Sequence, residues 1–393
     1  MKILHVLETM APAYGGPVRA IQTYATWLGA AGEDVTICTT DKDVPSGIIR
    51  GPVNTPIQEN GYTLWRFATD LHPYAYSRQM GHWLKSHVGR FDIVHVHGLY
   101  RYPPIAAARY ARRHNVPYIM RPFGSLDPYL YNKAERRSFK RFHERLFDFP
   151  ALNNASAIQY TADEEMALTK PLGLRAPAII IPVGLDADIF DRPDLDGRMR
   201  KKLGVGNRPL VLFFGRLASK KGLNISIQAF ARVRAQMRDA VFVIAGPDND
   251  GMKPQVEQWL DEAGVRGSTI LPGMLNGDDR IALLRDADLF VLQSHTENFG
   301  ISVVEALAAG TPVVISDRIN LWPDVAQYDA GLITPCEASL AADAMIKVLA
   351  DKNLQLQLVQ GGSKLINERY SRTAIVNQLL VLYRKAISEK KLA

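Results

Sequence analysis

The feature that most constrains the fold of this chain is a regular alternation between short apolar runs and longer segments with helical periodicity. Runs of strand length include residues 2–8 (KILHVLE) and 91–98 (FDIVHVHG). Such runs are largely apolar on both faces, which is typical of parallel strands covered by helices on each side. The alternation therefore predicts an α/β fold built on a mostly parallel sheet.

The same alternation starts again in the second half of the chain. Residues 177–190 (PAIIIPVGLDADIF) end the first series, and residues 208–217 (RPLVLFFGRL) open the second. A chain of 393 residues has the length of two ordinary domains. We therefore predict a first domain over 1–185 and a second over 186–372, followed by an amphipathic helix within 373–393 that either domain could hold.

The composition argues against several classes of protein. Cys38 and Cys336 are the two cysteines, and they lie far apart without the spacing of metal ligands, so we expect neither a disulfide framework nor a zinc site. No apolar run approaches the roughly 18 residues that cross a bilayer. The N-terminal stretch is typical of a buried strand, not of a secretion signal. We therefore expect a cytoplasmic protein.

Net charge is concentrated in the first half of the chain. The formal net charge is +7, and residues 1–185 hold 21 Lys and Arg against 15 Asp and Glu, whereas the remainder holds 26 against 25. A basic half indicates an anionic partner, such as a phosphorylated lipid or a membrane surface. We do not expect nucleic acid, because the sequence lacks zinc-finger spacing, an RNA-binding aromatic motif and a clear helix-turn-helix pattern.

Basic and glycine-rich turns follow two of the predicted strands. Arg216 and Lys221 (in FFGRLASKKGLN) lie between a strand and a helix start, where two cations and free N–H groups suit a diphosphate. Gly15 and Gly16 follow the first strand, where backbone can approach a phosphate closely. A solvated turn explains either segment taken alone, and the P-loop and GxGxxG patterns are both missing.

Two glutamates flank a helix start in the stretch HTENFGISVVEALAAG. Glu297 falls in the loop after a strand, and Glu305 lies more than a turn into the following helix. A carboxylate can accept hydrogen bonds from adjacent sugar hydroxyls, and the N–H groups of Phe299, Gly300 and Ile301 can serve a ligand. The alternative is that Glu305 caps or salt-bridges locally.

Together these segments resemble retaining glycosyltransferases of the GT-B fold, in glycosyltransferase family 4, of the bacterial surface-polysaccharide type. The resemblance rests on the E-x7-E spacing with FG between the glutamates, and on GRL…KKG, GGPVRAI, DIVHVHG and IPVGLDADIF in the family's order. It covers essentially the whole chain. It implies two Rossmann-like, doubly wound domains facing each other across a cleft, with the final helix crossing back to the N-terminal domain.

The resemblance also implies how a UDP- or GDP-sugar donor is bound. Arg216 and Lys221 would neutralise the diphosphate, the Gly15–Gly16 turn would contact its distal phosphate, and Glu297 would bind the sugar hydroxyls. The other donor contacts would be Glu305 at the ribose, Gly273, Met274 and Leu275 at the base, and Asn298, Phe299, Gly300 and Ile301 beside the sugar.

On the acceptor side, the stretch that begins RPFGSLDPYLY resembles a subgroup whose loop reads roughly R-G-M-L-x-P-W. Arg121 and Gly124 would then lie at the cleft, where Arg121 would assist the leaving phosphate or orient a glycan or lipid-linked acceptor. His97 is a further candidate at a strand end, although a lone histidine there is more often structural. Two departures from the family are Asn298, where glycine is usual, and ERYSRTA, where an aromatic residue often stands.

A basic helix is predicted over residues 133–149, and two interpretations of it stay open. In the first, it contacts an anionic membrane peripherally, on the inner face of the cytoplasmic membrane. In the second, its aromatic stripe packs on the core and its charges are merely solvated. Its basic residues are Lys133, Arg136, Arg137, Lys140, Arg141 and Arg145, and its stripe is Phe139, Phe142, Leu146 and Phe149.

The predicted reaction is transfer of a hexosyl group with retention of configuration, and it requires no cofactor or metal. Cations and helix N-termini would stabilise the leaving diphosphate, and the Asp-x-Asp triplets at 186–188, 248–250 and 286–288 fall in linker, turn and helix positions. A nucleotide-sugar epimerase of the same fold and a non-catalytic nucleotide-sugar-binding protein are the alternatives. An epimerase would give an epimer from donor alone, and a binding protein would give no product with any acceptor.

Overall fold

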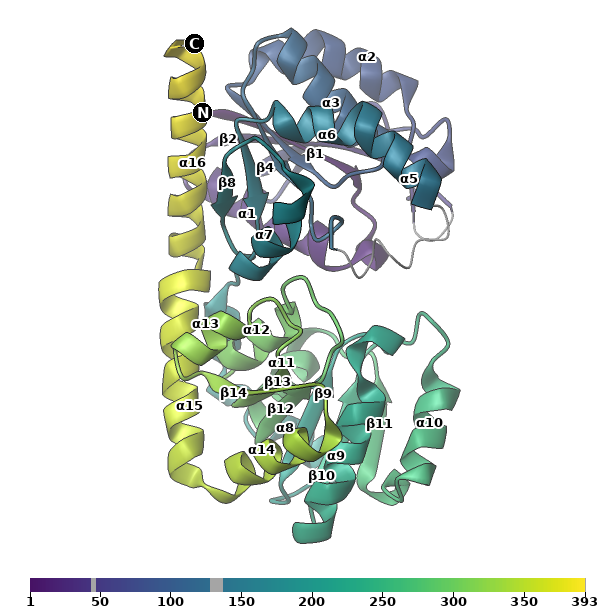
Figure 1. The fold of residues 1–393 in the computed structure, drawn as a ribbon, viewed down its shortest axis with the longest axis vertical. Helices are drawn as coiled ribbons and strands as arrows, with labels where there is room; N and C mark the ends of the chain where they lie inside the picture. Colours follow the sequence, from purple (N-terminus) through teal and green to yellow (C-terminus); the bar gives the residue numbers. More distant parts are fainter. Residues whose placement is uncertain (44–46, 128–136, 393) are drawn as a thin grey trace. The chain divides into compact units, whose positions relative to one another are not determined.

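The structure is a computed structural model, and it describes residues 1–43, 47–127 and 137–392. The chain divides into two compact units (Figure 1). Unit 1 comprises Met1–Gly184 with Arg372–Ala393, and unit 2 comprises Leu185–Ser371. The boundaries predicted from the sequence differ from these by one residue.

Unit 1 is built on an eight-stranded sheet in the order β3-β4-β2-β1-β5-β6-β7-β8. All neighbours are parallel except β3 and β4, which form an antiparallel edge. The strands are β1 Lys2–Thr9, β2 Asp34–Thr40, β3 Pro56–Glu59, β4 Tyr62–Phe67, β5 Ile93–His97, β6 Tyr118–Arg121, β7 Ala157–Tyr160 and β8 Ala178–Ile180. Its helices include α1 Gly16–Ala30, α2 Arg78–His87, α3 Tyr102–Arg113, α5 Arg137–His143, α6 Phe149–Asn153, α7 Asp163–Thr169 and α16 Arg372–Leu392.

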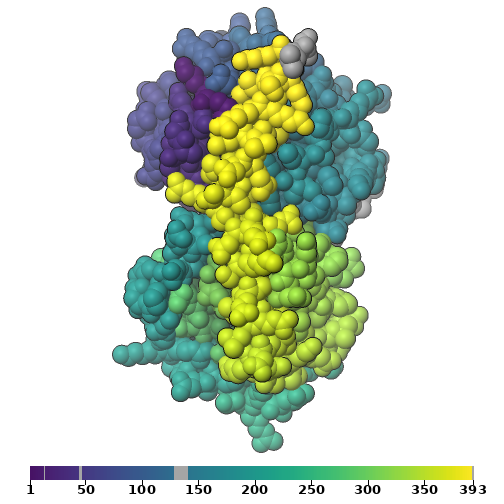
Figure 2. All heavy atoms as spheres, turned by 90° about the vertical axis from the view of Figure 1, so that its left-hand side faces the viewer, coloured from purple at the N-terminus to yellow at the C-terminus, as the bar shows by residue number. Residues whose placement is uncertain are grey.

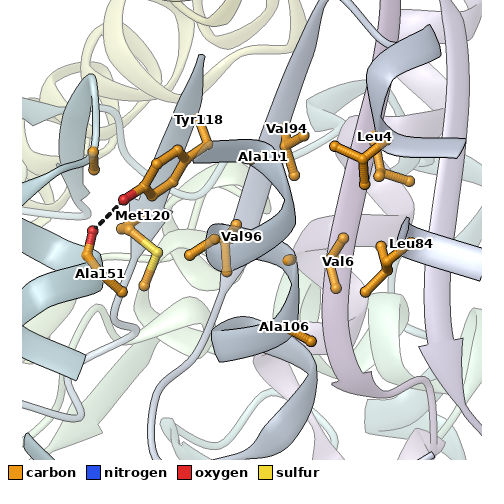
Figure 3. Packing of buried hydrophobic residues seen from close by; sticks show 14 of the residues in the cluster. Leu4, Val6, Leu84, Val94, Val96, Ala106, Ala111, Tyr118, Met120 and Ala151 are labelled. Atoms are coloured by element: carbon orange, nitrogen blue, oxygen red, sulfur yellow. Dashed lines mark hydrogen bonds between the residues drawn. The ribbon is translucent and has the colours of Figure 1, made fainter. Parts of the chain in front are cut away.

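The sheet of unit 1 has an apolar core on each face. Because side chains alternate along a strand, Leu4 and Val6 of β1 point to one face, where they pack with Val94 and Val96 of β5 (Figure 3). On the same face the Tyr118 hydroxyl donates a hydrogen bond of 2.7 Å to the carbonyl of Ala151. Helices α2, α3 and α6 cover this face, while α1 and α16 cover the other.

The C-terminal helix α16 is part of unit 1. Ile375, Leu379 and Tyr383 join the core on the α1 face, and the Tyr383 hydroxyl lies 2.7 Å from Nδ1 of His95. Figure 2 shows the helix, in yellow, along the surface of unit 1 beside the purple N-terminal segments. The predicted return of the final helix to the first domain therefore agrees with the structure, in spite of the departure in ERYSRTA.

Unit 2 is built on a six-stranded, fully parallel sheet in the order β11-β10-β9-β12-β13-β14. Its strands are β9 Leu210–Phe214, β10 Val241–Ala245, β11 Thr269–Gly273, β12 Leu289–Leu292, β13 Val313–Ser316 and β14 Gly331–Thr334. Its helices are α8 Arg198–Lys202, α9 Leu223–Gln236, α10 Lys253–Glu262, α11 Gly277–Asp286, α12 Ile301–Ala308, α13 Trp322–Gln327, α14 Ala338–Ala350 and α15 Lys352–Leu365.

The predicted α/β class with two parallel-sheet domains is confirmed by these two units. Within the described residues, no helix is both long enough and apolar enough to cross a membrane.

Candidate active site

The strand order of unit 2 changes direction between β9 and β12. The chain leaves β9 toward β10 and β11 and then returns to the other side of β9 with β12. In open parallel sheets, ligands bind at the carboxyl ends of the strands at such a point. The loop after β9 carries Arg216 and Lys221, and the loop after β12 carries Glu297. The fold thus brings these predicted donor-site residues to one edge of one sheet.

Gly222 allows the two loops to approach closely. It precedes α9 with a φ of +61°, and a Cβ at this position would lie 1.8 Å from the carbonyl oxygen of Gln293. Next to it, the carbonyl of Lys220 accepts hydrogen bonds from the Ser294 hydroxyl at 2.8 Å and the His295 N–H at 2.7 Å. A side chain at position 222 would therefore push the lysine loop away from the loop after β12.

Glu297 lies between two lysines. Its carboxylate forms an ion pair with Lys221, and Nζ of Lys220 lies 3.7 Å from its other oxygen. Burial by itself would raise the pKa of Glu297, but the charges of Lys221, Lys220 and Arg216 hold that pKa below its usual value. The side chains of Glu297 and Lys221 are 16% and 12% exposed. The carboxylate is therefore ionised at neutral pH and still reachable by a ligand.

Arg216 is the most exposed of these cations. Its side chain is 46% exposed, and its guanidinium lies 3.9 Å from the carboxylate of Asp250. An exposed pair at this distance contributes little energy, so the guanidinium can turn toward a bound anion. With Lys220 and Lys221, Arg216 gives this edge an excess of positive charge, which suits a diphosphate.

The loop after Glu297 leads directly into α12. Gly300 starts this helix with a φ of +80°, and a Cβ here would lie 2.9 Å from the side chain of Ile319. Phe299 is buried, and its ring meets that of Tyr370 edge to face at 5.5 Å. The helix start has no side-chain cap, so its positive dipole end faces this loop, including Asn298 and Ile301.

Glu305 pairs with a residue that sequence reasoning missed. Its carboxylate accepts a hydrogen bond of 2.6 Å from Arg280 on α11, and the guanidinium of Arg280 lies 5.4 Å from the ring centre of Phe190. The Glu305 side chain is only 7% exposed. The salt-bridge alternative for Glu305 is therefore realised in this structure, and its role at the ribose stays a prediction. No spacing in the sequence pointed to Arg280.

The segment predicted to line the base ends a neighbouring strand. Gly273 is the last residue of β11, and its carbonyl accepts a hydrogen bond of 2.9 Å from the Gly246 N–H after β10. The Gly215 N–H after β9 donates to the end of β10 in the same way, at 2.9 Å. Met274, which follows, is 55% exposed, and Leu275 is half-buried. The predicted contacts of unit 2 thus lie along one carboxyl edge.

Unit 1 has a pocket where its own strand order changes direction, between β1 and β5. The pocket has a volume of about 90 Å³ and is lined by residues that include Glu8, Tyr14, His97 and Ser125. The carboxylate of Glu8 is held by Arg101, whose Nε lies 3.0 Å away. Burial, followed by the charge of Glu8, raises the pKa of Tyr14. Of these residues, sequence reasoning singled out only His97.

The predicted glycines of unit 1 lie beside this pocket. Gly15 has a φ of +81° and, with Gly16, begins α1 directly after Tyr14. Gly124 stabilises the turn after β6, because its N–H donates a hydrogen bond of 2.7 Å to the buried carboxyl of Glu165. Contacts of Gly15 or Gly16 with a donor, and of Gly124 with an acceptor, stay predictions.

Arg121 is fully buried, which differs from its predicted position facing a ligand. Its guanidinium lies over the rings of Tyr24 and Phe123, at 5.0 and 4.3 Å, and none of its nitrogens has a hydrogen-bond partner within the described part of the chain. The cause is strand alternation, because Arg121 shares the face of Ile119 that packs against α1 and α16. A direct contact with an acceptor or leaving group would require this packing to open.

Three histidines share this buried layer with Arg121. The rings of His5 and His97 are stacked at 5.2 Å with a 2.9 Å hydrogen bond between Nδ1 and Nε2, and His95 lies beside them. Ligand nitrogens of the three lie within 4.8 Å of one another, a spacing compatible with a metal ion. Stacked rings do not converge on one point, however, and the adjacent Arg121 charge opposes a cation. We therefore interpret the group as a hydrogen-bonded polar layer.

Burial lowers the pKa of each of these histidines. The pKa of His5 falls to about 3, first because of burial and then because of the Arg121 charge. Burial likewise holds the pKa values of His95 and His97 well below the ordinary value of 6.5, with further lowering by the neighbouring histidines and Arg121. The layer is therefore neutral except for Arg121.

The Asp-x-Asp triplets serve the local fold. Asp286 accepts hydrogen bonds from the N–H groups at 197, 199 and 200, and Asp288 pairs with Arg200 at 2.7 Å. Asp248 accepts from the N–H groups that open α10, at 2.6 and 3.0 Å. Asp186 precedes a short 3₁₀ turn in the linker. These positions agree with the predicted linker, turn and helix placements.

Comparison with known proteins covers both units. The family described as Glycosyl transferase 4-like domain matches residues 15–184, and the family described as Glycosyl transferases group 1 matches residues 196–365. The phosphatidyl-myo-inositol mannosyltransferase of Mycolicibacterium smegmatis is 26% identical over 379 residues, which are 94% of this chain and 90% of that protein.

A further relative matches part of the chain, and a solved structure has the same fold. The alpha-D-kanosaminyltransferase of Streptomyces kanamyceticus is 29% identical over 206 residues, and the match spans about half of either chain, 51% of this one and 53% of the relative. Anabaena Alr3699/HepE, whose crystal structure contains UDP and glucose, superposes with a TM-score of 0.77 at 19% identity, covering 98% of this chain and all of that one. The chain belongs to the family 4-type glycosyltransferases of the GT-B fold.

Proposed function

We propose that this protein is a retaining glycosyltransferase that moves a hexosyl group from a UDP- or GDP-sugar to a hydroxyl of a glycan or lipid-linked acceptor. We place it in polysaccharide or glycoconjugate synthesis, and we propose that turnover requires no metal ion. The observation that carries the proposal is the ionised Glu297 carboxylate held by Lys220 and Lys221, with Arg216 beside it, at the carboxyl edge of unit 2.

The proposed reaction makes electrostatic demands that this edge meets. As the bond between the anomeric carbon and the diphosphate oxygen breaks, negative charge builds on the diphosphate and positive charge on the sugar. Arg216, Lys221 and the start of α12 would stabilise the leaving group, which is often the largest single contribution to catalysis. Glu297 would accept hydrogen bonds from sugar hydroxyls and so orient the anomeric carbon.

Retention would follow from substitution on one face of the sugar. The acceptor oxygen bonds to the anomeric carbon on the side that the diphosphate leaves, and the acceptor proton passes to the departing phosphate oxygen. A double displacement would need a carboxylate nucleophile beside the anomeric carbon. Among the predicted site residues, Glu297 is the candidate nucleophile. Its carboxylate is paired with two lysines, which favours a role in binding the sugar.

The names of the relatives support a nucleotide-sugar donor. One structural neighbour holds UDP and glucose, one relative is named as a kanosaminyltransferase, and another is named as a mannosyltransferase of phosphatidyl-myo-inositol. The pocket of unit 1 offers the carboxylate of Glu8 and the hydroxyl groups of Tyr14 and Ser125 for an acceptor hydroxyl. We propose this pocket as the acceptor side of the reaction.

The test begins with a thermal-shift screen of UDP- and GDP-sugars, because a ligand that binds the folded state raises the apparent melting temperature. Stabilising donors are then incubated with and without sugar acceptors in the presence of EDTA, and the product's anomeric configuration is read by NMR. The proposal predicts transfer with retention in EDTA. An epimer formed without acceptor, or strict dependence on magnesium or manganese, would contradict it.

A further inference from the structure

A second surface of unit 1 combines arginines with protruding apolar side chains. It lies where α3 meets the helical segment formed by α5, a π-helical turn over Glu144–Asp148, and α6. A groove of about 470 Å³ runs between them, lined by residues that include Arg109, Arg112, Arg113, Leu146, Phe147 and Pro150. We call this region the α3/α5 surface, and it takes no part in the site described above.

The apolar part of the α3/α5 surface projects into solvent. The exposed fractions are 62% for Phe142, 50% for Leu146 and 42% for Phe147. The interpretation in which the aromatic stripe packs on the core is therefore wrong for Phe142 and Leu146, although it holds for Phe149, which packs against the core of unit 1. The side chain of Phe139 lies outside the described residues.

The charged part of the surface has no paired carboxylate among the residues that the structure describes. Arg109, Arg112 and Arg113 follow the i, i+3, i+4 spacing of one helix face, and Arg141 and Arg145 lie on the facing segment; all five are exposed. Among residues 1–43, 47–127 and 137–392, no carboxylate forms an ion pair with any of the five. Unpaired arginines bind phosphate through paired N–H groups.

We propose that the α3/α5 surface docks the protein on an anionic phospholipid bilayer. Lipid phosphates occupy the groove at Arg109, Arg112 and Arg113, while Phe142 and Leu146 enter the boundary between headgroups and acyl chains. A bilayer accepts protruding apolar side chains without a complementary shape, whereas an acidic protein or an RNA would need to provide a cavity for each. Only the consequence for the reaction, delivery of the enzyme to a lipid-linked acceptor, rests on the proposed function.

The test is flotation of the full-length protein with vesicles of phosphatidylcholine, with and without phosphatidylglycerol. The first variant neutralises three arginines, Arg109→Gln, Arg112→Gln and Arg113→Gln. Its control makes the same charge change on exposed positions of α9, α14 and the loop after α9, Arg232→Gln, Arg238→Gln and Lys347→Gln.

The second variant is Phe142→Ser with Leu146→Ser. Its control is Leu356→Ser with Val381→Ser, which removes side chains that are 61% and 64% exposed elsewhere on the surface. Melting temperatures check that all four variants are folded.

We expect salt-sensitive binding to vesicles with phosphatidylglycerol and little binding to phosphatidylcholine alone. The arginine variant should lose roughly a hundredfold in partition coefficient, because three basic residues act at the anionic surface, and the apolar variant should also bind less, while both controls bind like wild type. Absence of vesicle binding, equal loss in the controls, or retention on an acidic polypeptide or RNA instead of vesicles would overturn the proposal. No donor is present, so failure of the proposed transfer would not affect the result.

Discussion

Charged residues at the candidate site of unit 2 pair with one another near the surface, whereas Arg121, on the α1/α16 face of unit 1, is buried and forms no ion pair within residues 1–43, 47–127 and 137–392. In unit 2, Glu297 meets Lys220 and Lys221, and all three remain partly exposed. In unit 1, Arg121 is fully buried, and its neighbours are His5 and His97, which burial keeps neutral.

The two arrangements differ in whether a charged group can leave its present partner to bind a ligand. An accessible ion pair can trade one partner for a bound phosphate or hydroxyl at modest cost. A buried, uncompensated guanidinium is instead held by the packing around it and is costly to keep. The comparison therefore favours donor binding at the strand edge of unit 2 and a structural, acid-sensitive role for the polar layer of unit 1.

The largest expected effect is acid destabilisation of unit 1. His5, His95 and His97 are neutral in the fold because their pKa values are lowered, whereas the unfolded chain binds protons below the ordinary pKa of 6.5. Their contribution to stability is therefore complete above pH 6.5 and falls below it, by about 1.4 kcal/mol per pH unit for each histidine. Chemical unfolding from pH 7 to pH 4 measures the slope.

A His5→Asn variant should reduce this slope by about a third, and the exposed His82→Asn should leave it unchanged. A slope equal in wild type and His5→Asn would show that the layer does not control acid stability.

The next largest effect concerns Lys221 and Lys220. Lys221→Ala removes the direct partner of Glu297 and a predicted diphosphate contact, so kcat/KM for transfer should fall by about 10²–10³-fold. Lys220→Ala removes a more exposed lysine at 3.7 Å from the carboxylate and should cost less than about tenfold. Steady-state kinetics measure kcat/KM for both variants. Equal losses of kcat/KM would show that the distance of each lysine from Glu297 does not determine its contribution to transfer.

A third comparison uses two glycines with the same backbone conformation. Gly222 and Gly204 have φ values of +61° and +64°, but a Cβ would meet the Gln293 carbonyl only at position 222, since nothing lies within 4 Å at position 204. Gly222→Ala should destabilise unit 2 by more than about 2 kcal/mol and impair transfer, against about 1 kcal/mol for Gly204→Ala. Denaturant unfolding measures both values, and similar costs would contradict the close approach of the two loops.

The smallest effect, with the opposite sign, is expected at Arg121. Arg121→Met replaces a buried charge by an apolar side chain of similar length, so the free energy of unfolding should stay constant or rise by about 1 kcal/mol. Loss of several kcal/mol would show that the guanidinium is compensated after all. The same variant also tests whether Arg121 contacts the acceptor or the leaving group directly. A direct role requires the rate of transfer to fall while the free energy of unfolding does not.

The two units also differ in how far the sequence could predict them. Strand positions followed from the apolar runs, and the run over 91–98 contains β5, Ile93–His97, in the structure. The motifs after β9 and β12 were identifiable because a parallel sheet brings strand ends to one edge. Lys220 stood next to Lys221 in the same motif and could have been included.

What the sequence could not show depends on side-chain direction and on distant partners. The face toward which Arg121 points depends on strand register, so its burial was not predictable from the motif that contains it. The pairing of Glu305 with Arg280, 25 residues away in the chain, left no local pattern. The exposure of Phe142 and Leu146 likewise depends on which side of the helical segment meets the core.

The most direct test of the central claim separates nucleotide binding from transfer in a Glu297→Gln variant, which keeps the shape of the side chain and removes its charge. Calorimetric titration with UDP or GDP and an assay of sugar transfer are run on the same folded preparation. We predict nucleotide affinity within a few-fold of wild type and transfer reduced by about 10³-fold. Near-normal transfer in this variant would contradict the assignment of Glu297 to the donor sugar.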